Sequence, residues 1–243
     1  MEWNISFGID KICPDKQELL NNTFLQIITL YHTLMTSKVN MDEYESQFAT
    51  INPQQPLKLL ADWVQEAKDL GIAEPDAMNL ATVDRAGNPH NRMVLMRHIN
   101  DREIGFFTNL ESNKASEIFA TQRTSSTLWW PQLGRQVRIE GTAIEMPRDM
   151  VEEYYQTRPR NSQLSAWASK QSMELDSMER LHQEFRKYEA KFSNKKVPTP
   201  IFWGGFTILV DKIEYWYGKP FRLHERIILS KEGNNWSKTR IYP

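Results

Sequence analysis

The sequence predicts a mainly β protein, an antiparallel barrel with helical additions that makes the chain α+β. Two observations predict this class. Runs with alternating apolar and polar residues occur in groups, as Val137, Ile139, Gly141 and Ala143 do within residues 136–145. Helical patterns stand between these groups of strands and do not alternate with single strands, which favours an antiparallel sheet. We expect residues 51–243 to form this domain and residues 1–50 to form a partly helical extension.

The expected elements follow in order. Apolar residues at helical spacing predict an amphipathic helix over residues 15–37, and a second helix runs from Pro56 to about Leu70, where Gly71 ends it. Ser112 is expected to cap a short helix to about residue 121, and further helices are expected over residues 148–157 and 173–192. Alternation and turn residues predict strands over residues 77–84, 90–99, 104–108, 125–130, 136–145, 205–217 and 222–229, with a last strand after residues 233–235.

Composition excludes several classes of function. The 243 residues carry 30 basic and 31 acidic side chains, so no global charge attracts nucleic acid or an acidic membrane. The apolar stretch over residues 24–35 is too short and too polar to span a bilayer. Cys13 is the only cysteine, and the N-terminus has no signal-peptide pattern, so we expect a cytoplasmic protein. The five histidines show no metal-ligand spacing, and no glycine-rich nucleotide motif occurs, so no metal is expected.

Two arginines on one expected strand are candidate anion ligands. Arg92 and Arg97 lie five residues apart, so they point to opposite faces if the strand is regular, and each can meet a different anion. Arginine forks bind phosphate oxygens bidentately and keep their charge at any working pH. The alternative is a pair of solvated strand arginines.

Four further segments contribute cations, hydroxyls or amides. Phe107-Thr108 precedes Ser112-Asn113-Lys114 at a helix start, which suits an anion, although a simple helix cap explains the same residues. Gln136 enters a strand and is either an amide ligand or a surface residue. Tyr154 and Arg158 share a helix face, and Ser162 follows Pro159, so the three can form a second phosphate pocket or a plain basic helix terminus. Gln171 and Ser172 add another amide and hydroxyl.

The most specific physical signal lies near the C-terminus. Arg222, His224 and Arg226 share one face of the expected strand over residues 222–229. Three such side chains repel one another unless an anion lies between them. A solvated strand face is the alternative.

Taken together, these segments resemble the pyridoxine/pyridoxamine 5′-phosphate oxidase family. The resemblance runs from about Pro56 to Pro243 and preserves the order of the family's motifs. The motifs that carry it are Thr157-Arg158-Pro159-Arg160, Ser162-Gln163, Ser169-Lys170-Gln171-Ser172, Phe202-Trp203-Gly204-Gly205-Phe206 and Arg222-Leu223-His224-Glu225-Arg226. The resemblance implies a homodimer of split Greek-key barrels that binds FMN at the subunit interface.

The resemblance also implies roles for individual residues. The FMN contacts that it implies are Arg92, Met93, Val94, Leu95, Met96, Arg97, Phe107, Thr108, Asn113, Lys114, Gln136, Gln171, Ser172, Trp216 and Arg226. The implied substrate contacts are Arg97, Tyr154, Arg158, Ser162, Arg222, Leu223 and His224, with Arg222 and His224 as the catalytic pair against the pyridine ring. The implied reaction oxidises pyridoxamine or pyridoxine 5′-phosphate to pyridoxal 5′-phosphate, with oxygen as acceptor and hydrogen peroxide as product.

Three departures from the family pattern are visible. Arg97 stands where the family usually has lysine, and Asn113 replaces a usual arginine, so we expect FMN binding to be retained but weaker. The residues before Tyr44 lack a basic pair that many members place over the substrate. Two rivals therefore remain: a related FMN split-barrel oxidase acting on another ring, such as a phenazine, and a non-catalytic flavin or pyridoxal-phosphate binding protein.

Overall fold

The structure is a computed structural model of the chain, and it describes residues 46 and 48–243. The described part belongs to one compact unit, residues 46–243. Cys13, the expected helix over residues 15–37 and most of the predicted extension lie outside the described residues. Phe48, from the end of that predicted extension, is fully buried in the core of the barrel.

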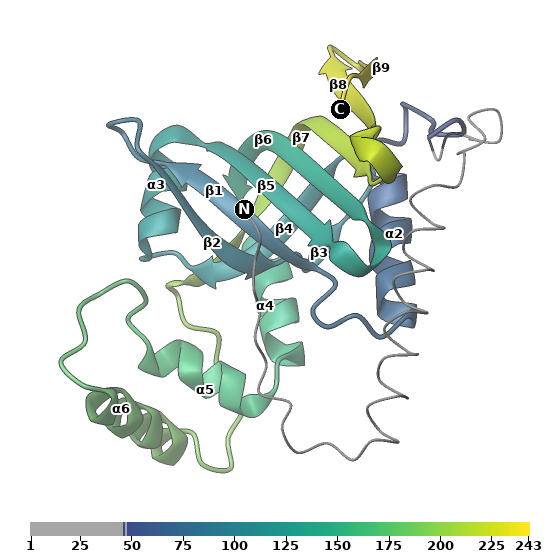
Figure 1. The fold of residues 1–243 in the computed structure, drawn as a ribbon. Helices are drawn as coiled ribbons and strands as arrows, with labels where there is room; N and C mark the ends of the chain where they lie inside the picture. Colours follow the sequence, from purple (N-terminus) through teal and green to yellow (C-terminus); the bar gives the residue numbers. More distant parts are fainter. Residues whose placement is uncertain (1–45, 47) are drawn as a thin grey trace, which may run out of the picture. The chain divides into compact units, whose positions relative to one another are not determined.

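Within the described residues, nine strands pair antiparallel in a single sheet (Figure 1). They are β1 (Ala77–Val83), β2 (Pro89–Leu95), β3 (His98–Ile99), β4 (Glu103–Asn109), β5 (Arg123–Trp130), β6 (Arg135–Glu145), β7 (Trp203–Tyr217), β8 (Glu225–Glu232) and β9 (Asn235–Ile241). The sheet order is β2-β1-β5-β6-β7-β4-β3, and β8 and β9 extend it from the second half of β7. The curled antiparallel sheet confirms the predicted α+β split barrel.

Strand β7 organises the sheet. Its whole length from Phe206 onward pairs with β6, while its other edge pairs first with β4 and then with β8. The register with β6 shifts between Glu140 and Gly141, a bulge that bends the two long strands. A Cβ on Gly141 would lie 2.3 Å from the carbonyl oxygen of Leu209, so only glycine fits at this bend.

Strands β2 and β3, at the two ends of the order β2-β1-β5-β6-β7-β4-β3, are consecutive in the chain. After Leu95 the chain leaves β1: the amide of Met96 donates to the carbonyl of Asp76 (2.8 Å), and the amide of Arg97 donates to the carbonyl of Gly105 in β4 (2.8 Å). The chain thus passes from the β1 edge to the β4 edge and curls the sheet. The prediction of one regular strand over residues 90–99 is therefore wrong, because closing the barrel interrupts that strand at residues 96 and 97.

Helix α2 (Lys58–Asp69) packs against the barrel through Leu60, Trp63, Val64 and Ala67. No side chain at its N-cap position accepts a hydrogen bond. The buried hydroxyl of Tyr215 takes this role from β7: it accepts from the amide of Leu60 (3.1 Å) and donates to the carbonyl of Pro56 (2.7 Å). This helix therefore depends on a tertiary contact for its start, which the sequence alone does not reveal.

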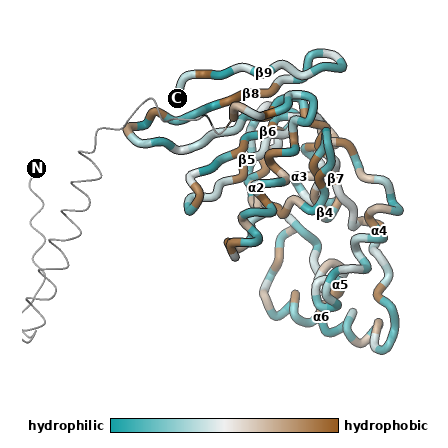
Figure 2. The backbone as a smooth tube through the Cα atoms, turned by 90° about the vertical axis from the view of Figure 1, so that its right-hand side faces the viewer, coloured by the Kyte–Doolittle hydropathy of each residue, from teal (hydrophilic) through white to brown (hydrophobic). Residues whose placement is uncertain are grey.

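The remaining helices are α3 (Asn113–Thr121), α4 (Arg148–Thr157), α5 (Arg160–Ala168) and α6 (Met178–Lys191). Helices α4, α5 and α6 lie together at one end of the barrel (Figure 1) and share a second apolar cluster around Tyr155 and Trp203. Helix α6 is mainly hydrophilic (Figure 2) and buries no residue fully. None of the described helices is long and apolar enough to cross a membrane.

The structure differs from the predicted helices in three places. Residues 173–177 precede α6 and are not helical, because the hydroxyl of Ser177 accepts from the amide of Arg180 (3.2 Å) and starts the helix there. Helix α5 was not predicted: Pro159 breaks α4 and at the same time provides a suitable first turn for a new helix. Ser112 does precede α3, but its hydroxyl donates to the carbonyl of Asn109 (2.7 Å) and does not cap the helix.

We predict that Tyr215→Phe destabilises the barrel by about 1–3 kcal/mol, because the carbonyl of Pro56 and the amide of Leu60 lose a buried partner. Urea unfolding measures this loss as a lower transition midpoint. Tyr242→Phe is the matched control, since Tyr242 is 93% exposed and should leave the midpoint unchanged. Equal midpoints for Tyr215→Phe and the parent protein would contradict the capping role.

Candidate active site

A large cavity lies between the barrel and helices α3, α4 and α5, with a volume of about 1000 Å³. It collects residues from six separate segments of the chain. Of the residues singled out from the sequence, it is lined by Arg92, Met93, Val94, Leu95, Arg97, Phe107, Thr108, Asn113, Lys114, Tyr154, Arg158, Ser162, Gln171 and Ser172. Met96 is not among them, because its side chain is buried in the core of the barrel.

Lys114 is a buried cation at the start of α3. Its ammonium donates to Thr108 Oγ1 (3.1 Å), Ser112 Oγ (3.1 Å) and Gln171 Oε1 (2.9 Å), all of which are neutral oxygens. Burial, and secondarily the charge of Arg92, lowers the pKa of Lys114 to about 8. An anion bound here would therefore interact with a positive charge whose hydrogen-bond partners among the described residues are all neutral.

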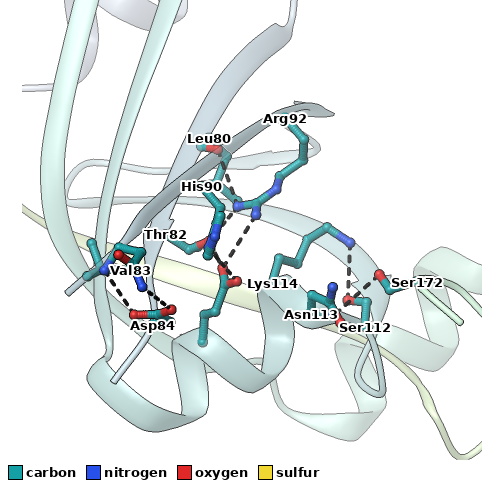
Figure 3. A network of polar contacts seen from close by, with 12 residues as sticks. Leu80, Thr82, Val83, Asp84, His90, Arg92, Ser112, Asn113, Lys114 and Ser172 are labelled. Atoms are coloured by element: carbon teal, nitrogen blue, oxygen red, sulfur yellow. Dashed lines mark hydrogen bonds and ion pairs between the residues drawn. The ribbon is translucent and has the colours of Figure 1, made fainter. Parts of the chain in front are cut away.

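Arg92 reaches from β2 toward the first turns of α3 (Figure 3). Its guanidinium contacts the hydroxyl of Thr82 and lies 3.4 Å from Glu117 Oε2. Glu117, which is mostly buried, also bonds the hydroxyl of Thr82 and lies 2.8 Å from Nδ1 of His90. The arginine is thus held in place beside Lys114 before any ligand arrives.

Figure 3 also shows the contact between Asn113 and Ser172. The backbone N–H of Asn113 donates to Ser172 Oγ (3.3 Å), and this hydrogen bond connects the loop after α5 to the start of α3. Ser172 has a positive φ of 72°, and the Asn113 side chain is exposed toward the cavity. Helix α3 and this loop therefore form one wall of the cavity.

Arg158 is a second, partly buried cation of the cavity. Its guanidinium lies over the ring of Trp203 (4.8 Å) and near that of Tyr155 (5.6 Å), while its buried Nη1 has no hydrogen-bond partner within the described residues. Burial lowers the pKa of Arg158, and no carboxylate in the described part of the chain offsets that effect. A buried donor without an acceptor is costly, so this position suits a bound anion.

Aromatic rings line the wall beside Arg158. Phe107 stacks on Tyr154 with centroids 4.0 Å apart and planes 3° apart, and on Trp203 at 5.4 Å. Ser162, in the first turn of α5, completes this side of the cavity. Tyr154, Arg158 and Ser162 therefore line the same cavity.

The other predicted residues lie elsewhere on the protomer. Gln136 and Trp216 are paired neighbours on β6 and β7 and line a shallow hollow together with Trp129. The ring of His224 lies against Trp216 with centroids 4.6 Å apart, and Arg226 is bonded to the buried Glu214 (2.7 Å). This second group shares no lining residue with the large cavity.

The predicted strand over residues 222–229 is wrong in its first three residues. Pro220–Arg222 forms a short 3-10 turn, with φ of 57° at Phe221 and 62° at Arg222, and β8 begins only at Glu225. Arg222, His224 and Arg226 therefore do not share one strand face. Because proline cannot pair in a central ladder, a turn around Pro220 was the available signal.

Sequence reasoning missed the partners that hold the predicted cations. Asp76 pairs with Arg97, Glu117 with Arg92, Glu214 with Arg226, and Trp203 underlies Arg158. Each partner lies on a different element from its cation, so no local spacing points to it. Only Trp203, inside a quoted motif, carried a signal in the sequence.

Comparison with known proteins identifies the family of this chain. Residues 64–192 match the family described as pyridoxamine 5′-phosphate oxidase, and residues 203–243 match a pyridoxine 5′-phosphate oxidase C-terminal dimerisation region. The pyridoxine/pyridoxamine 5′-phosphate oxidase of Leptospira biflexa is 40% identical over 188 residues, covering 77% of this chain and 89% of that protein. The enzyme of that name from Haemophilus influenzae is 38% identical over 204 residues, covering 83% and 97%.

Two solved structures are similar in fold. PhzG from Burkholderia lata, in complex with tetrahydrophenazine-1-carboxylic acid, superposes with a TM-score of 0.77 at 27% identity, covering 83% of this chain and 98% of that one. A pyridoxamine 5′-phosphate oxidase-related, FMN-binding protein from Nostoc punctiforme gives a TM-score of 0.64 at 15% identity, covering 77% and 97%. Fold and cavity thus define a split-barrel protein with a cavity lined by the four cationic side chains Arg92, Arg97, Lys114 and Arg158. The sequence matches place it more narrowly: the chain belongs to the pyridoxamine 5′-phosphate oxidase family.

The pKa of Lys114 predicts a pH dependence of stability. Between pH 8 and the ordinary lysine value of 10.5, the unfolded chain holds this proton and the folded chain does not, so the free energy of unfolding rises with pH. Lys114→Met removes this contribution. We expect the stability of the parent protein relative to Lys114→Met to increase from pH 8 to pH 10 in urea unfolding. A difference that stays constant over that range would contradict the burial of a charged Lys114.

Proposed function

We propose that the chain oxidises pyridoxamine 5′-phosphate and pyridoxine 5′-phosphate to pyridoxal 5′-phosphate with FMN as its cofactor. One observation carries the proposal: the single large cavity contains two separate cation centres. Arg92 and Lys114, which lie together at α3, form one, and we assign Arg97 and Arg158, which line the same cavity from the segment after β2 and the end of α4, to the other. A phosphorylated cofactor and a phosphorylated substrate need two such centres in one cavity.

The residues present fit FMN. Lys114 supplies a buried cation with only neutral oxygen partners, and Arg92 lies beside it at the N-terminal end of α3. Thr108, Ser172 and Gln171 add hydroxyl and amide groups around the same point. This set is suited to a phosphate dianion, while the apolar residues of β2 can cover the flavin ring. Asn113 offers no charge there, which supports weaker binding.

A second copy of the chain is needed to complete the site. Thr108 pairs with Gly204 at the start of β7, whereas Gln136 pairs with Trp216 twelve residues further along the same strand. With the rise per residue of a β-strand, twelve residues separate Gly204 from Trp216 by roughly 40 Å along β7. One flavin mononucleotide molecule is shorter than this distance. Gln136, Trp216 and Arg226 therefore serve the FMN bound by the partner subunit, at the interface of a homodimer.

Exposed apolar side chains support this interface. Trp129 is 48% exposed, and Phe221 and Leu223 are 59% and 53% exposed in the turn before β8. Large apolar groups gathered near the second hollow are typical of a surface covered by another chain. Residues 203–243, which include this turn, match a dimerisation region.

The chain's own residues bind and orient the substrate. Arg158, whose Nη1 lacks a partner, binds the substrate phosphate together with Arg97, Tyr154 and Ser162. Nδ1 of His224 accepts a hydrogen bond from the backbone N–H of Lys219 (3.1 Å). With Nδ1 as acceptor, Nε2 is the ring nitrogen that can donate a proton to the substrate. Arg222, exposed in its turn, approaches the pyridine ring from the partner subunit.

FMN, when bound, supplies the two-electron acceptor for the C4′ position of the substrate. In total, pyridoxamine 5′-phosphate, oxygen and water give pyridoxal 5′-phosphate, ammonia and hydrogen peroxide. The protein's contribution is to hold two phosphates at a fixed separation, so that the reacting carbon faces the flavin. One cysteine in 243 residues favours the cytoplasm as the place of this reaction.

A related oxidase acting on another ring is the second candidate, because the structure of PhzG with a tetrahydrophenazine carboxylic acid superposes on this chain. A carboxylate carries less charge than a phosphate and fewer acceptor oxygens. The unpartnered Nη1 of Arg158, with Arg97 in the same cavity, favours the phosphorylated substrate.

Anaerobic mixing tests the proposed reaction directly. The purified FMN-loaded protein is mixed with pyridoxamine 5′-phosphate while the flavin absorbance is followed. We expect rapid bleaching that returns when air is admitted. Unphosphorylated pyridoxamine is the control and should bleach the flavin far more slowly. A spectrum that stays yellow with every B6-vitamer phosphate would refute the proposal and leave a binding protein or another substrate.

We predict that Asn113→Arg tightens FMN binding, because it adds a cation at the exposed first turn of α3 beside Lys114. A partly exposed charge pair of this kind contributes roughly 1 kcal/mol, about a fivefold lower Kd. Quenching of flavin fluorescence on titration of the apoprotein measures this Kd. Asn113→Gln adds length without charge and should leave it unchanged; the same Kd in all three proteins would contradict the prediction.

A further inference from the structure

The pair formed by Asp76 and Arg97 has features that the proposed function does not use. Asp76 is only 6% exposed, and its Oδ2 lies 2.6 Å from Nη1 of Arg97. Among the described residues, Arg97 is the only side chain bonded to this carboxylate. A buried carboxylate without a counter-ion is costly, so Asp76 requires the cation.

The backbone fixes both partners at the point where the barrel closes. The carbonyl oxygen of Asp76 accepts a hydrogen bond from the backbone N–H of Met96 (2.8 Å). The backbone N–H of Arg97 donates to the carbonyl oxygen of Gly105 in β4 (2.8 Å). The side chain of Arg97 is 38% exposed and lines the cavity. Its guanidinium therefore lies between a buried acid behind it and the cavity in front.

A guanidinium can reach the two sides through separate nitrogens, whereas an ammonium must reach both from a single nitrogen. Arginine carries five N–H donors in a rigid planar fork, so one Nη can neutralise Asp76 while other donors face the cavity. Lysine carries its three donors on one nitrogen, which the buried carboxylate of Asp76 would draw away from the cavity. Asp76 thus makes arginine better suited than lysine to bind an anion at position 97.

We propose that Asp76 is a positioning residue for the substrate phosphate and makes phosphate binding depend on the arginine fork at position 97. This inference rests on the proposed function, because it takes the anion facing Arg97 to be the phosphate of a B6 vitamer. It also accounts for the departure at position 97: the larger cation is matched by a buried acid that holds one of its edges.

A double-mutant cycle tests the coupling. Arg97→Lys is made in the parent protein and in Asp76→Asn, which keeps the shape of the side chain and removes its charge. The dissociation constant of pyridoxal 5′-phosphate is measured on the FMN-loaded dimer by its absorbance change, together with KM and kcat for pyridoxamine 5′-phosphate. We expect Arg97→Lys to weaken binding about tenfold when Asp76 is present and less than threefold when it is Asn. The effect should fall on KM and the dissociation constant, with kcat nearly unchanged.

Equal losses in the two backgrounds would overturn the proposal, and so would a matching change in FMN affinity, which would assign the pair to the cofactor. If Asp76→Asn does not fold, Arg97→Gln replaces it. A lysine held by Asp76 should bind pyridoxal 5′-phosphate no better than this neutral glutamine, whereas near-parental binding by Arg97→Lys would refute the idea.

The exposed pair of Glu179 and Arg186 on α6 is the matched control. Its ion pair also measures 2.6 Å, and neither residue lines the cavity. Arg186→Lys and Glu179→Gln should leave pyridoxal 5′-phosphate binding unchanged, singly and together. Failure of the proposed function remains distinguishable, because a parent protein that neither turns over nor binds B6-vitamer phosphates fails before any variant is made.

Discussion

The pairing of strand β7 is the constraint on which the rest of the structure depends. Its 15 residues run from Trp203, which lies under Arg158 at the large cavity, to the second hollow at Trp216. The register with β4 and β6 fixes how far apart these two regions lie. A single protomer therefore keeps these two regions apart, and the proposed FMN site includes both only if a partner subunit contributes one of them.

The charges of the cavity form a second pattern. Lys114 and Arg158 have no carboxylate bonded to them within the described residues, and burial lowers the pKa of both. Their environments are neutral oxygens in one case and aromatic faces in the other. The two remaining cations each lie against a carboxylate, Arg92 against Glu117 and Arg97 against Asp76. The cavity thus combines two anchored cations with two that a dianionic ligand would stabilise.

Much of the fold was predictable because its signals are local. Alternating residues located the strands, and Gly71 and Pro159 marked helix ends. The structure confirms the predicted α+β barrel, and the sequence matches confirm the family. The predictions failed where tertiary structure overrides local pattern. Closing the barrel breaks the strand at residues 96 and 97, and the turn at Pro220–Arg222 removes Arg222 from β8. The roles implied for individual site residues stay predictions.

The sequence by itself determined the order of elements, the family and the residue types of the cavity, since periodicity, turn residues and motifs are properties of short segments. Tertiary structure decided which of these residues meet. It placed Arg97 against Asp76 and Arg92 against Glu117, and it separated Gln136 and Trp216 from the large cavity. The physical reason is that each such contact joins elements far apart in the chain, so it depends on how the sheet curls and where each strand is in register.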